Sequence, residues 1–407
     1  MIIADVENEK SLTEMAKKAR IIVNCCGPYR FFGEPVVKAC VEEGTHHVDV
    51  SGEPQYMERM QLKYNEKARE KGVYVISACG FDSIPSDLGL VFLQKKFDGT
   101  LNSVVTYMES WEEGQAVSGP AINYGTWESA VYGLAHAQEL RALRKELFTT
   151  RLPSFKPKLQ AKYVKEFCNF YTMKLFLALH SNSGFRTVPH KSEHLEGWVL
   201  PFPGADRSVM KRSQRLFYEK DQKRPVQIET YFILKSFWSV FLISIFGMIF
   251  QFLAKFDFGR SLLLKVSAHA ASIVIHVVFQ YPEKFSAGYF SRQPPSEEKI
   301  EKARFSVTLF GEGWKEKLAD VNDQYSTPPD KLISAKIKGS NPGYGATCVC
   351  LLLAAITVIT EPEKMPSGGG VYPPGYAFAN TSLIEQLNEN EVTFDVLFEK
   401  DLSDSKH

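Results

Sequence analysis

Neither sign of charge predominates in this sequence. Its 407 residues include 48 Lys and Arg against 47 Asp and Glu, so the formal net charge is only +1. A protein that binds nucleic acid through its phosphates needs a basic surface, and we therefore exclude that class. Disordered chains combine low hydrophobicity with high net charge, whereas 44% of these residues are hydrophobic. At about 150 residues per domain, we expect a globular protein of two or three domains.

Paired cysteines are also missing. The seven cysteines are an odd number, lie mostly in apolar runs and include no C-x-x-C spacing. This usage argues against a disulfide scaffold and favours a reduced, intracellular setting. We see no charged patch followed by an apolar run and a small-residue cleavage site, which would mark a secretory signal.

Several catalytic motifs are absent as well, among them a serine elbow, a P-loop and a complete G-x-G-x-x-G after a strand. His190, Glu193 and His194 have the H-x-x-E-H spacing of some zinc peptidases. Turns rich in Gly and Pro flank them, however, and no apolar helix surrounds them. His46 and His47 are neighbours on an expected strand and would face opposite sides of it. We therefore expect no metal site.

The first hundred residues alternate short apolar runs with helix-like segments, which is typical of a parallel sheet covered by helices. Met1 to Asp5 resembles the end of a buried strand, and Ser11 and Glu14 form a capping box for a helix that ends near Arg20. Further helices are expected over 33–43 and 54–71, and further strands over 21–25, 48–50 and 73–77. Each of these three strands ends in a polar or Gly-rich turn. Because parallel strands present their carboxyl ends at one edge, the turns over 27–29, 51–53 and 80–83 predict one pocket.

From Leu101 onward the strands become longer and alternate in polarity, which favours a second, α+β domain. We expect strands over 104–111, 226–234, 303–310 and 332–338, and one helix over 127–147. The last segment includes an apolar helix over 347–360, with Cys348 and Cys350 in the core, and a short helix and strand over 383–397. The expected domains are therefore 1–100, 101–340 and 341–407, the last returning to the first sheet.

One segment stands out by hydropathy. The 19 residues from Ser236 to Ala254 contain no charge and lie between Lys235 and Lys255, and a weaker run follows over 266–280. About 20 apolar residues are enough to cross a bilayer, so we favour association with a membrane or lipid surface. A buried helix and a hydrophobic dimer face are the alternatives. The basic stretch over 141–165 is interpreted as a solvated face, with a membrane-surface patch as its alternative.

The turn sequences carry a resemblance to a known family. The motifs over 23–36 (VNCCGPYRFFGEPV), 49–53 (DVSGE) and 80–89 (GFDSIPSDLG) resemble the saccharopine dehydrogenase-like oxidoreductases, and those over 343–347 and 369–374 fit that family's C-terminal return. The resemblance implies a Rossmann-like domain for NAD(P) and a second domain. It also implies a lipid-droplet or membrane location, with mitochondria as another. A lipidic enoyl or carbonyl substrate, in glycolipid or lipid metabolism, is the expected reactant. The rival hypothesis is a lipid-surface binding protein without turnover.

This sequence departs from the family at its start. The family begins with a strand, a Gly-rich turn and a helix, whereas Met1 falls near the expected third strand. We therefore expect an N-terminally truncated Rossmann-like sheet that lacks its first two strands and binds no dinucleotide, because the pyrophosphate would lack its helix N-terminus. The strand over 21–25 would become an unpaired apolar edge that invites aggregation or pairing with another chain, such as a homodimer.

The resemblance also assigns roles to residues of the three turns. Tyr29 and Asp82 are the side chains we choose first as proton donors. The alternative is that Asp82 and Ser83 only form the turn and cap the following helix. The residues expected near the cofactor are Asp5 at the adenine, Asn24, Gly27 and Pro28 at the nicotinamide ribose, and Ser51, Gly52, Gly80, Phe81 and Ser83 on the nicotinamide side.

Overall fold

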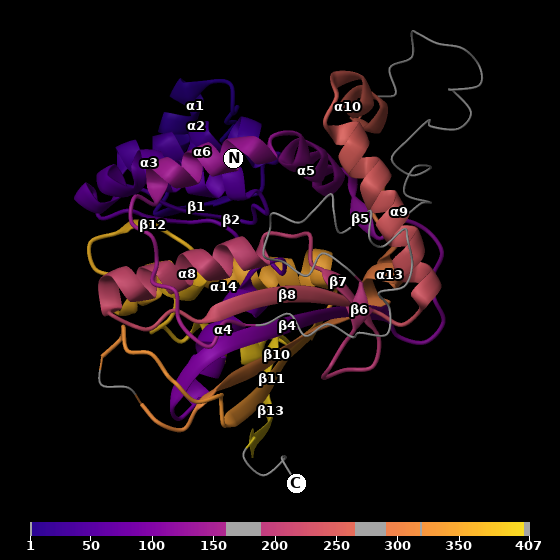
Figure 1. Cartoon of the computed structure of the whole chain (residues 1–407). Helices are drawn as coiled ribbons and strands as arrows, with labels where there is room; N and C mark the ends of the chain where they lie inside the picture. Colours follow the sequence, from indigo (N-terminus) through magenta and orange to yellow (C-terminus); the bar gives the residue numbers. More distant parts are fainter. Residues whose placement is uncertain (1, 160–188, 265–289, 318–319, 403–407) are drawn as a thin grey trace.

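The computed structural model describes residues 2–159, 189–264, 290–317 and 320–402. These residues form two main sheets, one in each of two stacked layers (Figure 1). The runs expected over 266–280 and part of the basic stretch over 141–165 lie outside the described residues.

The first sheet has four parallel strands in the order β1-β2-β3-β12. Side chains alternate between its two faces, since Val75 packs in one apolar cluster and Tyr74 and Ile76 pack in the other. Helices cover both faces, as in a doubly wound fold. The strands are β1 (Ile21–Asn24), β2 (His46–Asp49), β3 (Tyr74–Ile76) and β12 (Gly370–Tyr372), and the helices are α1 (Glu9–Ala16), α2 (Tyr29–Glu43), α3 (Pro54–Glu70) and α14 (Thr347–Thr360).

The start of the chain differs from the expectation. Residues 2–5 form no strand, and Ile3 is 85% exposed. A strand needs a neighbour for its backbone groups, and none of the described strands pairs with this segment, which leaves β1 at one edge of the sheet. The first helix begins at Glu9 because the Asn8 side chain accepts from the backbone N–H of Ser11, so the cap is Asn8 rather than Ser11.

The second sheet has seven strands in the order β13-β11-β10-β4-β8-β7-β6. Its largest apolar cluster is continuous with one face of the first sheet and includes helix α4, which follows the third turn. The strands are β4 (Thr100–Glu112), β6 (His190–Lys191), β7 (Trp198–Pro201), β8 (Gln227–Leu234), β10 (Ala303–Trp314), β11 (Lys331–Ser340) and β13 (Thr393–Asp401). The helices that pack close to it are α4 (Ile84–Lys96), α8 (Asp206–Asp221), α15 (Pro374–Ala377) and α16 (Leu383–Glu389).

The C-terminal segment divides between the two sheets. Helix α14 and strand β12 join the first sheet, as expected for the return over 341–407. Strand β13 instead pairs antiparallel with β11 in the second sheet. Its residues are mostly exposed, so a hydrophobic pattern gave no sign of which sheet it extends.

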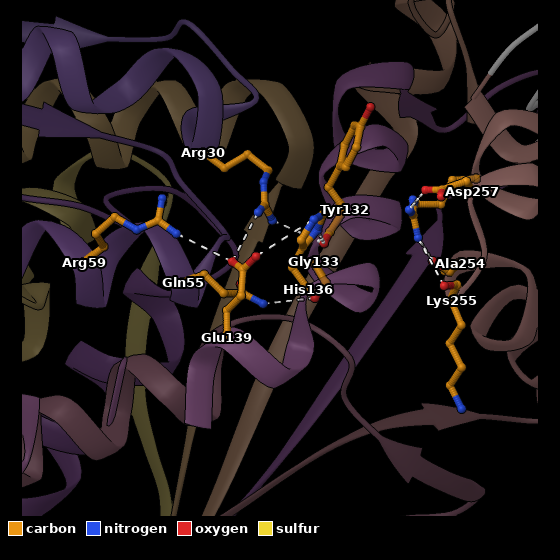
Figure 2. A network of polar contacts seen from close by, with 11 residues as sticks. Arg30, Gln55, Arg59, Tyr132, Gly133, His136, Glu139, Ala254, Lys255 and Asp257 are labelled. Atoms are coloured by element: carbon orange, nitrogen blue, oxygen red, sulfur yellow. Dashed lines mark hydrogen bonds and ion pairs between the residues drawn. The ribbon is translucent and has the colours of Figure 1, made fainter. Parts of the chain in front are cut away.

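The helix expected over 127–147 is two helices, α5 (Tyr124–Ala135) and α6 (Ala137–Leu147), that meet at His136. Figure 2 shows why the chain turns there: side chains from the first sheet's helices bind the last carbonyls of α5. Arg30 donates to the Tyr132 oxygen at 3.2 Å, and Gln55 donates to the Gly133 oxygen at 2.9 Å. Glu139 then lies within 3.4 Å of Arg30 and 3.6 Å of Arg59.

The uncharged segment forms helix α9 (Phe237–Ala254), which stands at the side of the molecule beside α10 (Asp257–Leu264) (Figure 1). One face is packed, since Phe250 and Ala254 lie in a cluster with Trp127 and Val131 of α5 and Leu263 of α10. Over its length only 17% of the helix is buried. Helix α14, with the preceding turn, is also long and apolar enough to span a membrane, but 39% of it is buried against the fold. The remaining elements are β5 (Ile122–Asn123), β9 (Phe290–Ser291) and α13 (Glu297–Lys302).

Candidate functional site

The turns that follow β1 and β2 meet at the carboxyl edge of the first sheet. Glu53, after β2, accepts from the backbone N–H groups of Tyr29 and Arg30 at 2.9 and 3.1 Å. The Ser129 hydroxyl of α5 donates to the same carboxylate at 3.0 Å. A helix N-terminus is a ready anion site, and here the N-terminus of α2 already holds an internal carboxylate. Burial raises the pKa of Glu53, while these hydrogen bonds favour its charged form.

Asp49 joins the second turn to the third. This fully buried residue ends β2 and accepts from the backbone N–H groups of Ser51 and Ala78 and from the hydroxyls of Tyr56 and Ser77, at 2.8 to 3.3 Å. Burial raises the pKa of Asp49 to about 6 against the opposing effect of these hydrogen bonds. Asp49 was not among the expected site residues, although its position as an acid at the end of a buried strand could have identified it.

The first turn is braced from within. Asn24 is buried, and its side-chain oxygen accepts from the backbone N–H of Cys26 at 3.0 Å. The Tyr29 hydroxyl donates to the Asn24 carbonyl at 2.9 Å, and burial holds the pKa of Tyr29 far above its ordinary value. Tyr29 was expected to act as a proton donor in the site. In the structure its hydroxyl donates to the backbone of its own turn. Gly27 and Pro28 lead directly into α2, with Pro28 at its N-cap.

Asp82, in the third turn, lies against both neighbouring segments. A Cβ on Gly52 would lie 2.9 Å from one Asp82 carboxyl oxygen, and a Cβ on Gly204 would lie 2.7 Å from the other. The carboxyl is thus in contact with the turn after β2 and with the segment before α8. Burial raises the pKa of Asp82 to about 7, and the backbone N–H of Ala205 lowers it. A carboxyl that exchanges its proton near neutral pH suits general acid catalysis.

The other residues of the third turn attach it to the rest of the fold. Gly80 faces Thr347 and Val50, and the Phe81 backbone N–H donates to the Thr347 hydroxyl at 3.2 Å. The Phe81 ring packs edge-on against Phe305, with centroids 4.5 Å apart. Ser83 is at the N-cap of α4, but its side chain makes no capping hydrogen bond and its buried hydroxyl has no partner. The alternative role of side-chain capping is therefore not seen for Ser83.

Asp5 lies just before the first helix and is held there by local hydrogen bonds. Its carboxylate accepts from the Glu7 backbone N–H at 3.0 Å, and its own N–H donates to the Ser11 hydroxyl at 2.9 Å. No contact that the structure gives for Asp5 joins it to the three turns. The proposed role at an adenine stays a prediction.

Metal ligation finds no support in the described parts of the chain, where no group of three or more His, Cys, Asp or Glu is placed to hold an ion. His46 accepts from the Tyr74 N–H, whereas His47 faces Asn24, so the two rings diverge as expected. His194 stacks on Phe310 at 4.2 Å. Cys350 is buried as expected, but Cys348 is exposed, because α14 turns that side away from the sheet.

Comparison with known proteins gives a consistent set of relatives. Residues 2–76 match the model of the saccharopine dehydrogenase NADP binding domain. The chain is 38% identical to the human saccharopine dehydrogenase-like oxidoreductase, over 98% of this chain and 82% of that protein. It is 36% identical to a lipid droplet localized protein of Caenorhabditis elegans, over 99% and 85% of the two chains. A trans-acting enoyl reductase of Mycobacterium ulcerans is 35% identical over 29% of this chain and 30% of that protein.

Proposed function

Because the chain belongs to the saccharopine dehydrogenase-like oxidoreductases, we propose that its three turns serve the NAD(P)H-dependent reduction of a lipidic enoyl or carbonyl substrate. The observation that carries this proposal is the Asp82 carboxyl. It lies at the carboxyl edge of the parallel sheet, where open α/β folds bind their ligands, in contact with the turn after β2 and the segment before α8, and burial raises its pKa to about 7.

The division of labour follows from the residues present. When bound, NAD(P)H supplies a hydride to the substrate carbon. Asp82 then delivers a proton to the substrate atom that gains negative charge, which is the oxygen of a carbonyl or the neighbouring carbon of an enoyl group. Asp49 and Glu53 hold the turns in place through the backbone hydrogen bonds they accept. The buried hydroxyl of Ser83 and the backbone around Gly80 are suited to the carboxamide of a nicotinamide.

We further propose that this chain holds the dinucleotide weakly. A pyrophosphate gains its affinity from a helix N-terminus with free N–H groups. At this sheet α1 is capped by Asn8 and α2 by Glu53, while α3 follows Glu53 and α4 has Asp82 and Asp87 beside its first turn. These four ends therefore have an internal cap or a nearby carboxyl, and a carboxylate repels phosphate, whereas the helical segment that begins at Pro342 and continues into α14 has no side-chain cap and no acid in its first turn.

The substitution Asp82→Asn tests the assignment of the acid. With saturating NADPH and a 2-enoyl or keto lipid presented in vesicles, we expect the turnover rate to fall by about 10²- to 10⁴-fold, the usual contribution of a general acid. Asp98→Asn is the matched control, because the Asp98 side chain is exposed and pairs with Lys317 at the surface. Full activity in Asp82→Asn would remove Asp82 from the mechanism.

We also propose that the protein works at a lipid surface. Helix α9, the turn after it and the start of α10 expose a set of large apolar side chains, and Lys235 and Lys255 flank α9. A monomeric soluble protein rarely exposes such a patch. A cavity of roughly 620 Å³ lies where α9 begins and includes Lys191, Trp198 and Lys235 in its lining. The exposed apolar residues are Phe237, Trp238, Phe241, Leu242, Ile243, Met248, Ile249, Phe252, Phe256 and Phe258.

The rival, a lipid-surface protein without turnover, rests on the same helix. The two proposals differ at Asp82, because a protein that only binds lipid does not need a carboxyl whose pKa lies near neutral pH. The Asp82→Asn assay therefore also separates them, since wild-type protein with no turnover at any pH would favour the rival.

A further inference from the structure

A second buried carboxyl lies beside the proposed acid. Asp206 is the first residue of α8 and is 1% exposed. One of its carboxyl oxygens accepts from the Ser86 hydroxyl of α4, and the other has no hydrogen-bond partner among the described residues. Gly204, whose Cβ position abuts Asp82, is only two residues before Asp206. The segment that abuts Asp82 thus leads directly into Asp206, and the charge of Asp82 acts on the Asp206 carboxyl.

The surroundings offer these carboxyls little compensation. In the described parts of the chain neither Asp82 nor Asp206 forms an ion pair with a Lys, Arg or His, and no metal site is found there. Asp87, on the same turn of α4, accepts from the Ser213 hydroxyl and the Gly375 N–H, both at 2.7 Å, and its other oxygen has no partner. It adds a third acid to the cluster.

The charged groups on the neighbouring elements are engaged elsewhere. On α8 the Arg207 guanidinium pairs with Glu229 of β8, and Arg212 donates to Gln61 of α3 while its charge favours ionised Asp87. On α15 the Tyr376 hydroxyl lies 3.4 Å from Asp221, at the far end of α8. Lys211 of α8 lies near Arg207 and Glu229, which affect its pKa.

The half-buried Asp82 and the buried Asp206 cannot both ionise at low cost, because each charge disfavours the other. Burial is the first cause that raises the pKa of Asp206 well above its ordinary value, and the charge of Asp82 is the second. An oxygen without a donor in a buried site costs free energy as a carboxylate and much less as a protonated acid. The pair therefore titrates as one unit with two steps.

We propose that Asp206 is a positioning residue that shares one proton with Asp82 and keeps the site supplied with an acid at neutral pH. This inference rests on the proposed function for its role in reduction, but the shared proton is a property of the fold alone. When Asp82 gives up its proton to the substrate, the pair becomes doubly ionised. The pair then regains a proton from solvent through Asp82, which is only half-buried.

The test compares wild type, Asp206→Asn, Asp82→Asn and the double variant. In Asp206→Asn the doubly ionised state no longer exists, so the basic limb of the kcat/KM profile should move to lower pH by about one unit or more. The number of protons released on unfolding at neutral pH should fall by about one, measured from the pH dependence of the unfolding free energy. In the Asp82→Asn background, Asp206→Asn should change the number of protons released on unfolding by a different amount, because Asp206 no longer has the Asp82 carboxyl with which to share a proton.

An unchanged proton count in Asp206→Asn would overturn the inference. If Asp206→Asn fails to fold, the infrared band of protonated carboxyls in wild-type protein decides instead: its loss with a midpoint near neutral pH supports the shared proton, and its absence at pH 6 overturns it. Absence of NADPH-dependent turnover in wild type would defeat the proposed function alone, since the proton count needs no activity.

Discussion

Gly52 shows how a single residue sets the position of the proposed acid. Its Cβ position would lie 2.9 Å from an Asp82 carboxyl oxygen, with no other atom within 4 Å. Real Cβ atoms do not approach so closely, so any side chain at position 52 must displace that carboxyl. The expected position of Gly52 near the cofactor stays a prediction, and its lack of a Cβ leaves room for the Asp82 carboxyl.

We expect Gly52→Ala to lower the free energy of unfolding by about 1 to 3 kcal/mol, the usual cost of overpacking, and to reduce turnover by displacing Asp82. Urea unfolding and the NADPH-dependent rate measure the two effects. Gly133→Ala is the control, because a Cβ there meets no atom within 4 Å and position 133 is helical. Equal effects of both substitutions would show that Gly52 has no special relation to the site.

Individual residues differ in how far the sequence could place them. The sequence could place Asp82 and Gly80 at the edge of the sheet, because they follow an apolar strand and the strand ends of a parallel sheet meet at one edge. Asp206 follows no predicted strand and carries no motif, so only the packing of α8 against α4 brings it to Asp82. Tyr29 was chosen for its chemistry, but its hydroxyl binds a backbone carbonyl of its own turn.

At the scale of elements, α5 contacts both the site and the exposed apolar helix α9. Ser129 of α5 donates to Glu53 at the site, and Trp127 of the same helix packs on Phe250 of α9 with ring centroids 4.7 Å apart. The Trp127 indole N–H also donates to the Leu263 carbonyl of α10 at 2.9 Å. A helix packed on one face in this way fits a position along a lipid surface better than one across a bilayer.

We expect the triple substitution of Leu242, Ile249 and Phe252 by Asp to release the protein from lipid vesicles and from cellular lipid droplets. These three side chains are 63%, 48% and 61% exposed, so the changes leave the packed face of α9 intact. A charge at the centre of an apolar segment costs about 2.5 to 3.5 kcal/mol on insertion scales. Flotation with vesicles and circular dichroism measure binding and folding.

Substituting Leu352 and Ile356 of α14 by Asp provides the control, because both are also exposed apolar residues on a long helix. Vesicle binding by the triple variant equal to that of wild type would contradict the lipid-surface proposal. So would fractionation of the wild type as a soluble protein. A mitochondrial fraction would instead place the surface in that organelle.

The sequence predicted α9 well because an uncharged run of this length allows few alternatives. It did not predict the break between α5 and α6, since His136 is not a strong helix breaker. The break depends on Arg30, which lies 102 residues before Tyr132, and on Gln55, which lies 78 residues before Gly133, and no local pattern reveals such distant partners. Strand β13 was assigned to the wrong sheet for the same reason, because its partner β11 is fixed by tertiary pairing.

At the scale of the whole molecule, the fold joins an NADP-binding-domain match over 2–76 to a second sheet and a helix that exposes large apolar side chains. The family membership makes an oxidoreductase site the leading proposal, and the capped helix ends make weak dinucleotide affinity its companion. Both concern the same edge of the first sheet. Nicotinamide contacts are expected there without a cradle for the pyrophosphate.

Parallel titrations with NADPH and reduced nicotinamide mononucleotide, followed by calorimetry, test this account most directly. We predict dissociation constants near or above about 1 mM for both, within about tenfold of each other, because the N-termini of α1 to α4 are capped or lie beside a carboxyl and would add little affinity for the pyrophosphate. Asp82→Asn should alter both affinities alike. Micromolar binding of NADPH, with no detectable binding of the mononucleotide, would contradict the account.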